Sequence, residues 1–374
     1  MTFTTDYQEI IQLVNRFDPK NYARTRNHIR GEVSRLSPYI SRGVLSTKML
    51  RDSLLERSYD LSKIEKFVQE LAWRDYWQQI WIAKGDAIDS DLKRAQTLVD
   101  HHQTPRAIVD ASTGLEAIDK AIDDLYKTGY MHNHVRMYLA AIACNYGHSH
   151  WHAPALWHYY HLLDGDWASN ALSWQWVAGS NAGKKYIADQ KNVNRYTDSE
   201  QQNTFLSGAY DRFPDMEVPE ELKETVAPVL TTPLPPHTII ELNDDLPTYL
   251  YNWYNLDPVW DEGVKANRVL LLEPSVFEKY PISQKSLDFM FDLAENIKGI
   301  RIAVCEFEEL AEGHADMSFH FKEHPLNGNC IGQEHPRDWM SSVTGHHASF
   351  FAFWKKARKE ILTPNLLTNK AFKA

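Results

Sequence analysis

A proline-rich segment divides this sequence into two parts with different hydrophobic patterns. Residues 225–236 read TVAPVLTTPLPP, and proline interrupts both helices and the central strands of sheets. We therefore interpret residues 201–236 as a linker between two domains, residues 1–200 and residues 237–374. The length of 374 residues also favours two domains, because it exceeds what one hydrophobic core usually holds.

The first domain has the pattern of a helical protein. Apolar and aromatic residues recur every three or four positions in several segments, which places them on one face of a helix. Two segments end at Gly85 and Gly129, a residue type typical of helix termini. The segments read IEKFVQELAWRDYWQQIWIAKG (64–85), GLEAIDKAIDDLYKTG (114–129), MHNHVRMYLAAIACNYG (131–147) and PALWHYYHLLDGD (154–166).

The second domain alternates short apolar runs with helical segments. The runs RVLLLEP (268–274), IRIAVCEF (300–307) and MSFHFKEH (317–324) have the character of buried strands. Residues 283–299 lie between two of them and have helical periodicity with a terminal glycine. This order predicts a small α/β layer, and hence a multidomain α+β protein.

Composition and charge exclude several classes of protein. The sequence has no signal peptide pattern and no apolar run near the roughly 18 residues of a membrane span, so we expect a cytoplasmic protein without membrane contact. The cysteines, Cys144, Cys305 and Cys330, are too far apart to suggest a disulfide framework or an iron–sulfur cluster. The net charge of −10 argues mildly against nucleic acid. Residues 1–200 carry equal numbers of acidic and basic residues, so a local basic groove stays possible there.

Two predicted helices carry polar and apolar side chains on one face. Asn133, Arg136 and Met137 share a face by their spacing, as do Glu70 and Trp73. Each pattern alone is better explained by a half-buried helix with a charged edge. A pocket with an aromatic wall and a hydrogen-bonding carboxylate is the alternative.

A serine loop and a group of histidines give weaker signals. The segment SRLSPYISRG places Ser34 and Ser37 near a helix start, where hydroxyls and backbone amides bind phosphate. It matches no nucleotide-binding fingerprint. Histidines are dense between residues 148 and 161, but no cysteine or carboxylate joins them at a ligand spacing. We therefore predict no metal site.

The segment Asp164–Gly179 reads DGDWASNALSWQWVAG and places three tryptophans among two aspartates and an asparagine. With four other segments, in the same order, it resembles the FAD-binding domain of the DNA photolyase/cryptochrome family. The others are YARTRN, SRLSPYISRGVLS, ELAWRDYW and TGLEAIDKAIDDLYKTGYMHNHVRM. The resemblance covers about residues 5–196 and implies an all-helical, FAD-binding domain of the photolyase type.

FAD is the cofactor that this resemblance implies. The matching positions are Tyr22, Ser34, Leu36, Ser37, Arg136, Asp164, Asp166 and Asn170. Ser34 and Ser37 belong to the family's FAD-phosphate loop, and Arg136 and Asp164 to an ion pair that flanks the flavin ring. Asn170 matches the asparagine that faces flavin N5 in photolyases, where plant cryptochromes tend to have aspartate. A neutral amide tolerates an anionic reduced flavin better than a carboxylate does.

The resemblance also implies a substrate, UV-damaged DNA with a flipped cyclobutane pyrimidine dimer (CPD). The positions that hold the dimer are Glu70, Trp73, Asn133, Met137 and Trp176. Photolyases that repair (6-4) lesions would instead have histidine at the positions of Asn133 and Met137, so we disfavour that activity.

Trp174 and Trp151 match the first two members of the family's electron-transfer chain to the flavin. The distal member is missing, because the sequence has no tryptophan between Asp91 and Ser112. Either another ring ends the chain, such as Trp157 or a tyrosine, or photoreduction is poor.

Two departures from the family bear on function. Residues 184–197, KKYIADQKNVNRYT, replace the family's RIFNP-like segment and resemble the iron–sulfur branch without its cysteines, so we expect no cluster. The family's Rossmann-like antenna domain precedes the FAD-binding domain. Here residues 237–374 resemble it, as a small α/β domain moved to the C-terminus. The sequence does not indicate an antenna chromophore.

Together these features predict a deoxyribodipyrimidine photolyase-like lyase, a monomer that repairs CPD lesions by light-driven electron transfer from reduced FAD. The alternative is a cryptochrome-like blue-light photoreceptor without repair activity. The acidic charge, the missing RIFNP-like segment and the domain order favour the alternative, whereas Asn170 and the complete set of substrate positions oppose it. A flavoprotein that has lost both roles is a third hypothesis.

Overall fold

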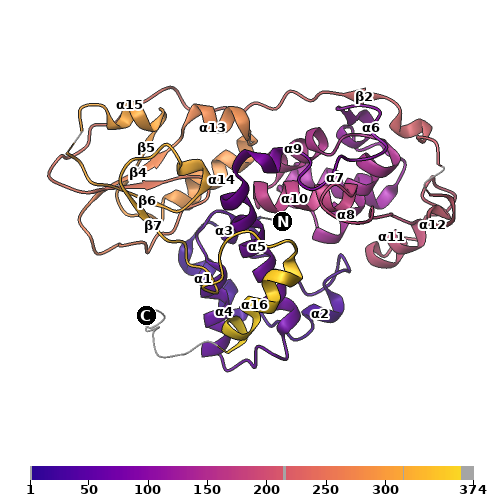
Figure 1. Ribbon diagram of the computed structural model, residues 1–374, viewed down its shortest axis with the longest axis horizontal. Coiled ribbons are helices and arrows are strands. Elements are labelled where there is room, and N and C mark those ends of the chain that lie inside the picture. The colour runs from indigo at the N-terminus through magenta and orange to yellow at the C-terminus, as the bar shows by residue number, and fades with distance from the viewer. Residues whose placement is uncertain (1, 214–215, 315, 364–374) are drawn as a thin grey trace.

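The computed structural model describes residues 2–213, 216–314 and 316–363. Helices dominate its first two hundred residues, and a parallel sheet follows (Figure 1). The helices of the first part are α1 (Tyr7–Arg16), α2 (Tyr22–Thr25), α3 (Ser37–Ser41), α4 (Thr47–Glu56), α5 (Glu65–Lys84), η1 (Gly85–Asp89), α6 (Arg106–Val109), α7 (Glu116–Thr128), α8 (Asn133–Ala141), η2 (Ile142–Tyr146), α9 (His152–His161), α10 (Trp167–Ala178) and α11 (Gln190–Thr197).

Local sequence signals fix the ends of the helices around the site. Gly129 follows α7 in the left-handed conformation, with φ of 69°, as the sequence predicts. Asp166 caps α10, because its side chain accepts a hydrogen bond from the backbone N–H of Ser169. Gly179 ends α10, again in the left-handed conformation. These caps give α10 fixed ends, between which Asn170 and the tryptophans lie, and Asp164 comes just before the N-terminal cap.

The second part is a five-stranded sheet in which each neighbouring pair of strands is parallel. Its order is β5-β4-β3-β6-β7. After β3, the chain adds β4 and β5 on one side and then β6 and β7 on the other, as in a doubly wound sheet with its switch point beside β3. Its elements are β3 (Thr248–Tyr251), β4 (Asn267–Leu271), α13 (Pro274–Lys279), α14 (Gln284–Ala294), β5 (Ile300–Ala303), α15 (Phe307–Ala311), β6 (Phe319–Lys322), η4 (Pro325–Asn327), β7 (Gln333–His335) and α16 (Phe350–Leu362). The predicted strand–helix alternation is confirmed.

The two faces of the sheet belong to different cores. Leu250 and Phe319 pack on one face with Phe307 of α15. On the other face, Tyr251 joins the large core that runs through the helical part and includes Leu287 of α14. Both faces of β3 are therefore buried, which is the usual state of parallel strands.

The segment predicted as a linker runs over the surface between the two parts (Figure 1). It contains α12 (Ala209–Arg212), η3 (Glu220–Leu222) and β2 (Thr225–Val226), which pairs antiparallel with β1 (Thr104–Pro105) of the helical part. The linker is thus held on the helical part by this pairing and by further contacts, among them the Arg106–Glu224 ion pair at 2.6 Å and the buried side chain of Leu222.

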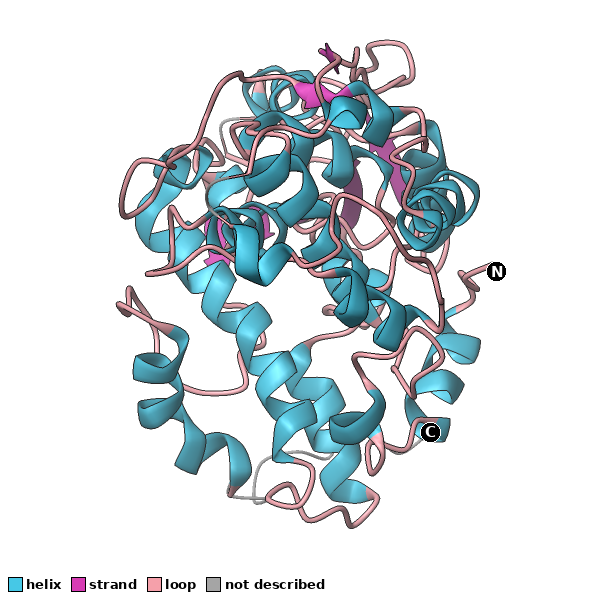
Figure 2. Ribbon diagram, turned by 90° about the vertical axis from the view of Figure 1, so that its right-hand side faces the viewer, coloured by secondary structure: helices cyan, strands magenta, loops and turns pink. Residues whose placement is uncertain are grey.

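The last helix of the chain lies on the helical part and not on the sheet. α16 packs beside α5 (Figure 1), and Arg358 donates two hydrogen bonds, of 2.8 and 2.6 Å, to the carboxylate of Glu65. Figure 2, turned by 90° from Figure 1, shows that helices make up most of the molecule. The range 237–374 therefore contains one element that completes the helical part.

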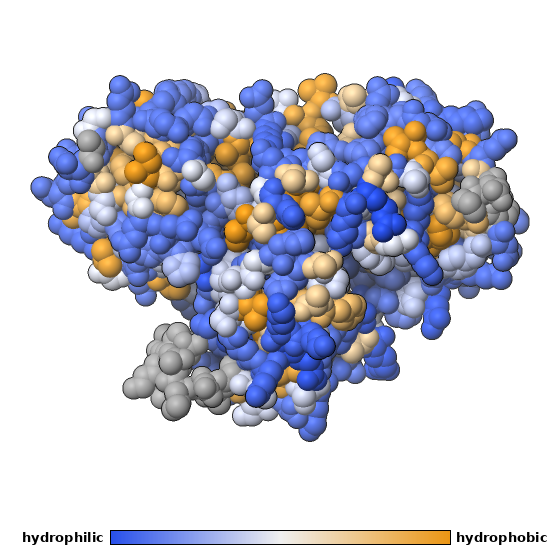
Figure 3. Space-filling view, in the orientation of Figure 1, coloured by the Kyte–Doolittle hydropathy of each residue, from blue (hydrophilic) through white to orange (hydrophobic). Residues whose placement is uncertain are grey.

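The surface is polar, with small separate apolar patches on the face drawn in Figure 3. Within the described residues, no helix is both long enough and apolar enough to cross a membrane.

Gly43 marks a close approach between the helical part and the loop after β3. Its φ is +67°, and a Cβ there would press on the carbonyl oxygen of Tyr254 and lie 2.9 Å from Asn255 Cα. We expect Gly43→Ala to destabilise the protein by about 1–3 kcal/mol more than Gly208→Ala, measured by urea unfolding. Gly208 is the matched control, because it has φ of +68° and nothing within 4 Å of the added Cβ. Equal losses would mean that the close contact is not rigid.

Candidate functional site

A buried ion pair joins α8 to the loop before α10. Arg136 Nη2 lies 2.9 Å from both carboxylate oxygens of Asp164, and Arg136 Nε donates to the Met131 carbonyl oxygen at 2.8 Å. The Asp164 side chain is only 3% exposed. Burial alone would raise the pKa of Asp164, but the charges of Arg136 and Arg74 outweigh it and hold that pKa below its usual value. Asp164 is therefore a buried carboxylate that stays ionised.

The serine loop meets this ion pair. Ser37 begins α3 and contributes to the low pKa of Asp164 by hydrogen bonding. Ser41, one turn later, donates its hydroxyl to the Asp164 carbonyl oxygen at 2.9 Å and accepts from Arg74 at 2.8 Å. Sequence reasoning predicted neither Ser41 nor Arg74 as a site residue. Both lie within the quoted motifs SRLSPYISRGVLS and ELAWRDYW, which is the only signal that could have found them.

The other two residues of the loop have local roles. The Ser34 hydroxyl accepts a hydrogen bond from the Leu36 backbone N–H at 3.3 Å. Leu36 is 1% exposed and precedes the first residue of α3. The loop is thus anchored by a buried leucine and a hydroxyl that turns back on its own backbone.

Two polar residues, Asp166 at the N-cap of α10 and Asn170 one turn later, are held by neighbouring helices. Asp166 accepts a hydrogen bond from Gln78 of α5 at 2.6 Å in addition to its capping bond. Asn170 is buried and donates its amide to the Ala155 carbonyl oxygen of α9 at 2.8 Å. α10 therefore sits between α5 and α9, and these two side chains are in fixed positions.

His158 of α9 lies next to these groups and was not predicted as a site residue. Its Nδ1 accepts a hydrogen bond from Trp174 Nε1 at 3.3 Å, whereas its Nε2 is buried without a partner. Burial lowers the pKa of His158 to about 3, so the ring is neutral at pH 7. The Ser169 hydroxyl on α10 is also buried without a partner. Such groups usually bind something in a native protein.

Tyr22 lies on α2, against α5. Its ring meets Phe67 edge to face at a centroid distance of 5.1 Å. Burial, with the negative charge of Glu70 nearby, raises the pKa of Tyr22 well above its usual value, so the hydroxyl stays protonated.

The predicted substrate residues differ in how far they reach solvent. Trp176 on α10 is 41% exposed and has Tyr186 as its aromatic neighbour, at 6.0 Å. Asn133 is exposed at the first turn of α8, and Met137 is half-buried one turn later. Glu70 is half-buried and pairs with Lys66 at 3.0 Å and with Arg26 at 3.5 Å.

Trp73, the other predicted aromatic wall, is covered by the last helix. Its ring stacks on Phe350 of α16 at a centroid distance of 3.8 Å and an angle of 11°. The motif SFFAFW at residues 349–354 is rich in aromatic residues, but nothing in its spacing identifies a partner far away in the sequence. The structure thus gives Trp73 and Trp176 different aromatic partners.

Two sets of aromatic rings lead away from α10. Trp174 and Trp151 are both buried, and Trp151 lies 6.4 Å from Trp167. The second set runs from Trp174 through His158 and Trp157 to Tyr126. The distances between successive ring centroids are 5.9, 6.3 and 6.1 Å.

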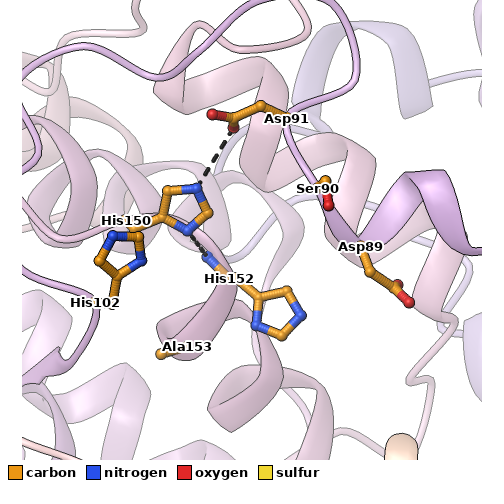
Figure 4. A pocket seen from close by; sticks show the side chains of 7 residues that line it. All are labelled: Asp89, Ser90, Asp91, His102, His150, His152 and Ala153. Atoms are coloured by element: carbon orange, nitrogen blue, oxygen red, sulfur yellow. Dashed lines mark hydrogen bonds and ion pairs between the residues drawn. The ribbon is translucent and has the colours of Figure 1, made fainter.

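A separate pocket of about 490 Å³ opens beside Trp151. Its lining comes from the end of η1, the start of α9 and the loop before β1, and it comprises Asp89, Ser90, Asp91, His102, His150, His152 and Ala153 (Figure 4). Despite this number of histidines and carboxylates, no three His, Cys, Asp or Glu side chains in the described ranges are arranged to hold a metal ion.

Comparison with known proteins identifies the helical part. Residues 67–207 match the family model for the FAD binding domain of DNA photolyase. The deoxyribodipyrimidine photo-lyase of Streptomyces griseus is 34% identical over 150 residues, which are 39% of this chain and 32% of that protein. A deoxyribodipyrimidine photo-lyase of Thermus thermophilus is 32% identical over 164 residues, 42% of this chain and 38% of the relative. Cryptochrome DASH of Gloeobacter violaceus is 28% identical over 176 residues, 43% and 34% of the two chains.

These matches therefore span about a third of the length of each curated relative. Among solved structures, the cryptochrome of Synechocystis sp. PCC6803 aligns with 52% of this chain and 44% of its own, at 22% identity and a TM-score of 0.46. A class III photolyase from Agrobacterium tumefaciens aligns with 51% and 44% of the two chains, at 24% identity and a TM-score of 0.40.

Proposed function

This chain belongs to the DNA photolyase/cryptochrome family through its FAD-binding domain, and on that premise we propose that it repairs CPD lesions in DNA by light-driven electron transfer from reduced FAD. The observation that carries the proposal is the buried Arg136–Asp164 pair inside the matched range, beside buried polar groups without partners. As a lyase it would cleave carbon–carbon bonds of the dimer and restore two pyrimidines.

The residues around the ion pair fit a flavin. Ser34, Leu36 and Ser37 would hold its phosphates, and Tyr22 would contact it upstream. Arg136, Asp164, Asp166 and Asn170 would surround its ring. Bound FAD supplies one-electron chemistry driven by blue light. The unpartnered Nε2 of His158 and hydroxyl of Ser169 support this fit, because both are buried next to these residues and need a hydrogen-bonding partner.

Five residues would bind the flipped lesion. Trp73 and Trp176 offer aromatic surfaces for the splayed bases, and Met137 offers an adaptable apolar contact. Glu70 and Asn133 would hydrogen-bond the amide edges and stabilise the charge that develops on the dimer. The exposure of Trp176 and Asn133 supports a binding face that opens to solvent.

The photoreceptor alternative is favoured by two contacts. Phe350 already occupies a face of Trp73, and Glu70 already pairs with two cations. DNA repair on this face would require these contacts to rearrange, whereas a signalling flavoprotein would keep them.

We further propose that residues 237–374 are the family's antenna-like α/β domain in permuted order. The parallel order β5-β4-β3-β6-β7 supports it. No particular pigment is implied.

The proposal is tested by repair of a CPD-containing oligonucleotide by the chemically reduced, FAD-loaded protein under blue light, with the restored thymines separated by chromatography. External reduction bypasses the internal electron chain. We expect repair in the light and none in the dark. FAD that is bound and reduced without repair would contradict the proposal and favour the photoreceptor.

Glu70→Ala is expected to lower light-driven repair about 10- to 100-fold while flavin content changes little, because it removes an acceptor to the reacting dimer. Glu32→Ala serves as a control, since Glu32 is an exposed glutamate that accepts a hydrogen bond from Asn21 at 3.0 Å and is not among the predicted substrate residues. Repair rate and the absorbance ratio of flavin to protein are measured together. If both fall in parallel, Glu70 supports the fold and not the lesion.

A further inference from the structure

Trp151 has a direct hydrogen bond to a carboxylate at the edge of a pocket. The ring is fully buried, and its Nε1 donates to Asp91 Oδ1 at 2.9 Å. The side chain of Asp91 is 21% exposed, so the carboxylate touches the buried indole on one side and the pocket on the other. A buried indole N–H needs a hydrogen-bond partner, and a neutral carbonyl oxygen would be sufficient. A carboxylate is a stronger acceptor than a carbonyl.

The pocket connects this carboxylate to further groups that accept protons. His150 Nε2 lies 3.6 Å from Asp91 Oδ1, and His102 stacks on His150 at 4.7 Å. Figure 4 shows His150 pointing at Asp91, with His102 beside it and His152 across the pocket. The volume of about 490 Å³ has room for several water molecules in contact with these polar groups.

We propose that Asp91 is the proton acceptor for Trp151 when this tryptophan gives up an electron during photoreduction of the bound flavin. This inference rests on the FAD binding in the proposed function, and the oxidant is the oxidised form of that FAD, excited by blue light, before it reaches the reduced form used for repair. One electron leaves Trp151 for Trp174, which has itself lost one to the flavin. The N–H bond of Trp151 breaks, its electron pair stays on Nε1, and the proton forms an O–H bond on Asp91.

Proton loss can keep the charges separated although the distal tryptophan of the electron-transfer chain is missing. An indole that has lost an electron is a much stronger acid than a neutral indole, so its proton can move to the bonded carboxylate and from there to water in the pocket. The product is a neutral radical, and the electron returns to it only if the proton returns as well. The charge separation is thus trapped at Trp151 without a third tryptophan. An added thiol then restores Trp151 by supplying one electron and one proton.

The pocket explains why the site of trapping is Trp151. Between Asp91 and Ser112, where the family's chain would place its last ring, this sequence has His101 and His102. His102 lines the pocket through which a proton reaches solvent. The competing route runs through His158 and Trp157 to Tyr126, where the Tyr126 hydroxyl donates to the Val109 carbonyl oxygen, a much weaker proton acceptor than a carboxylate.

Transient absorption of the FAD-loaded protein after a blue flash tests the assignment. The neutral and cationic tryptophan radicals differ in their visible spectra, so the protonation state of the radical is read directly. In the parent protein we expect a neutral radical that forms more slowly in D₂O. In Asp91→Asn we expect a cation radical, no isotope effect and at least tenfold faster charge recombination. Asp91→Glu restores a carboxylate and should restore the neutral radical.

Asp100→Asn is the matched control, because Asp100 bonds His148 at 2.8 Å in the same region without touching a tryptophan. It should behave as the parent protein. An unchanged neutral radical in Asp91→Asn would overturn the proposal. So would a radical that survives in Trp151→Phe and disappears in Trp157→Phe, because the electron would then leave by the competing route.

Different measurements test the proposed function and the assignment of Asp91. Repair by chemically reduced protein does not use these tryptophans, so loss of that repair contradicts the function and leaves the radical measurement intact. A normal repair rate with an unchanged radical in Asp91→Asn contradicts only the assignment of Asp91. Flavin content and circular dichroism of each variant identify any protein that has not folded.

Discussion

Arg136→Ala is expected to destabilise the protein by about 3–5 kcal/mol, because it leaves the buried carboxylate of Asp164 without its partner. The bidentate contact and the 3% exposure of Asp164 place this pair among the buried ones, where removal of one charge costs most. Urea unfolding at pH 7 gives the difference. Lys120→Ala, which breaks the exposed Lys120–Asp124 pair, should change stability little.

The pH dependence of this variant follows from the direction of the pKa shift. In the parent protein the folded pKa of Asp164 lies below its ordinary value of 3.8, so the pair stabilises the fold above that value and the contribution is lost as the pH falls through the folded pKa. Without Arg136, burial favours the protonated acid. The difference in the free energy of unfolding between the parent protein and Arg136→Ala should therefore decrease from pH 7 to pH 5. A constant gap would show that Asp164 finds another cation, such as Arg74.

Phe350→Ala is the second change with a large expected effect, a loss of about 3–5 kcal/mol. Phe350 is 2% exposed, stacks on Trp73 at 3.8 Å and begins the helix that covers α5. Removing the ring leaves a cavity between the two helices. Thermal and urea unfolding, followed by tryptophan fluorescence, measure the effect.

The neighbouring residue gives a matched control for this cavity. Phe351 is 68% exposed on the same helix, so Phe351→Ala should change stability by about 0.5 kcal/mol or less. Equal small effects of both variants would show that α16 is loosely docked and that Trp73 is free to meet a lesion. A large effect of Phe350→Ala alone supports a firm cover.

Much of the fold could be predicted because its signals are local. The glycine after α7, the periodicity of α5 and the apolar runs that became β4 and β6 each depend on a few neighbouring residues. The ion pair between Arg136 and Asp164 could not be derived in this way, since the two lie 28 residues apart. It came from the resemblance to photolyases, and its bonded geometry agrees with that resemblance. Its role toward FAD stays a prediction.

The features that escaped prediction depend on long-range docking. The amphipathic pattern of α16 indicates a helix with one buried face, but not which surface covers it. His158 was one of several histidines in a dense run, and nothing in the sequence distinguished it from those on the surface. The bond between Asp91 and Trp151 spans 60 residues and involves two loops next to helix ends.

The position of α16 constrains how this protein is made. Glu65 and Arg358, which join α5 to α16, are 293 residues apart. At the usual rate of about 5–20 residues per second, a ribosome needs about 15–60 s to travel between them. During that time the tryptophan-rich face of α5 has left the ribosome while its cover has not been synthesised. The nascent helical part thus exposes Trp73 and Tyr76 for many seconds, a period in which exposed apolar surface favours aggregation, until α16 covers these rings.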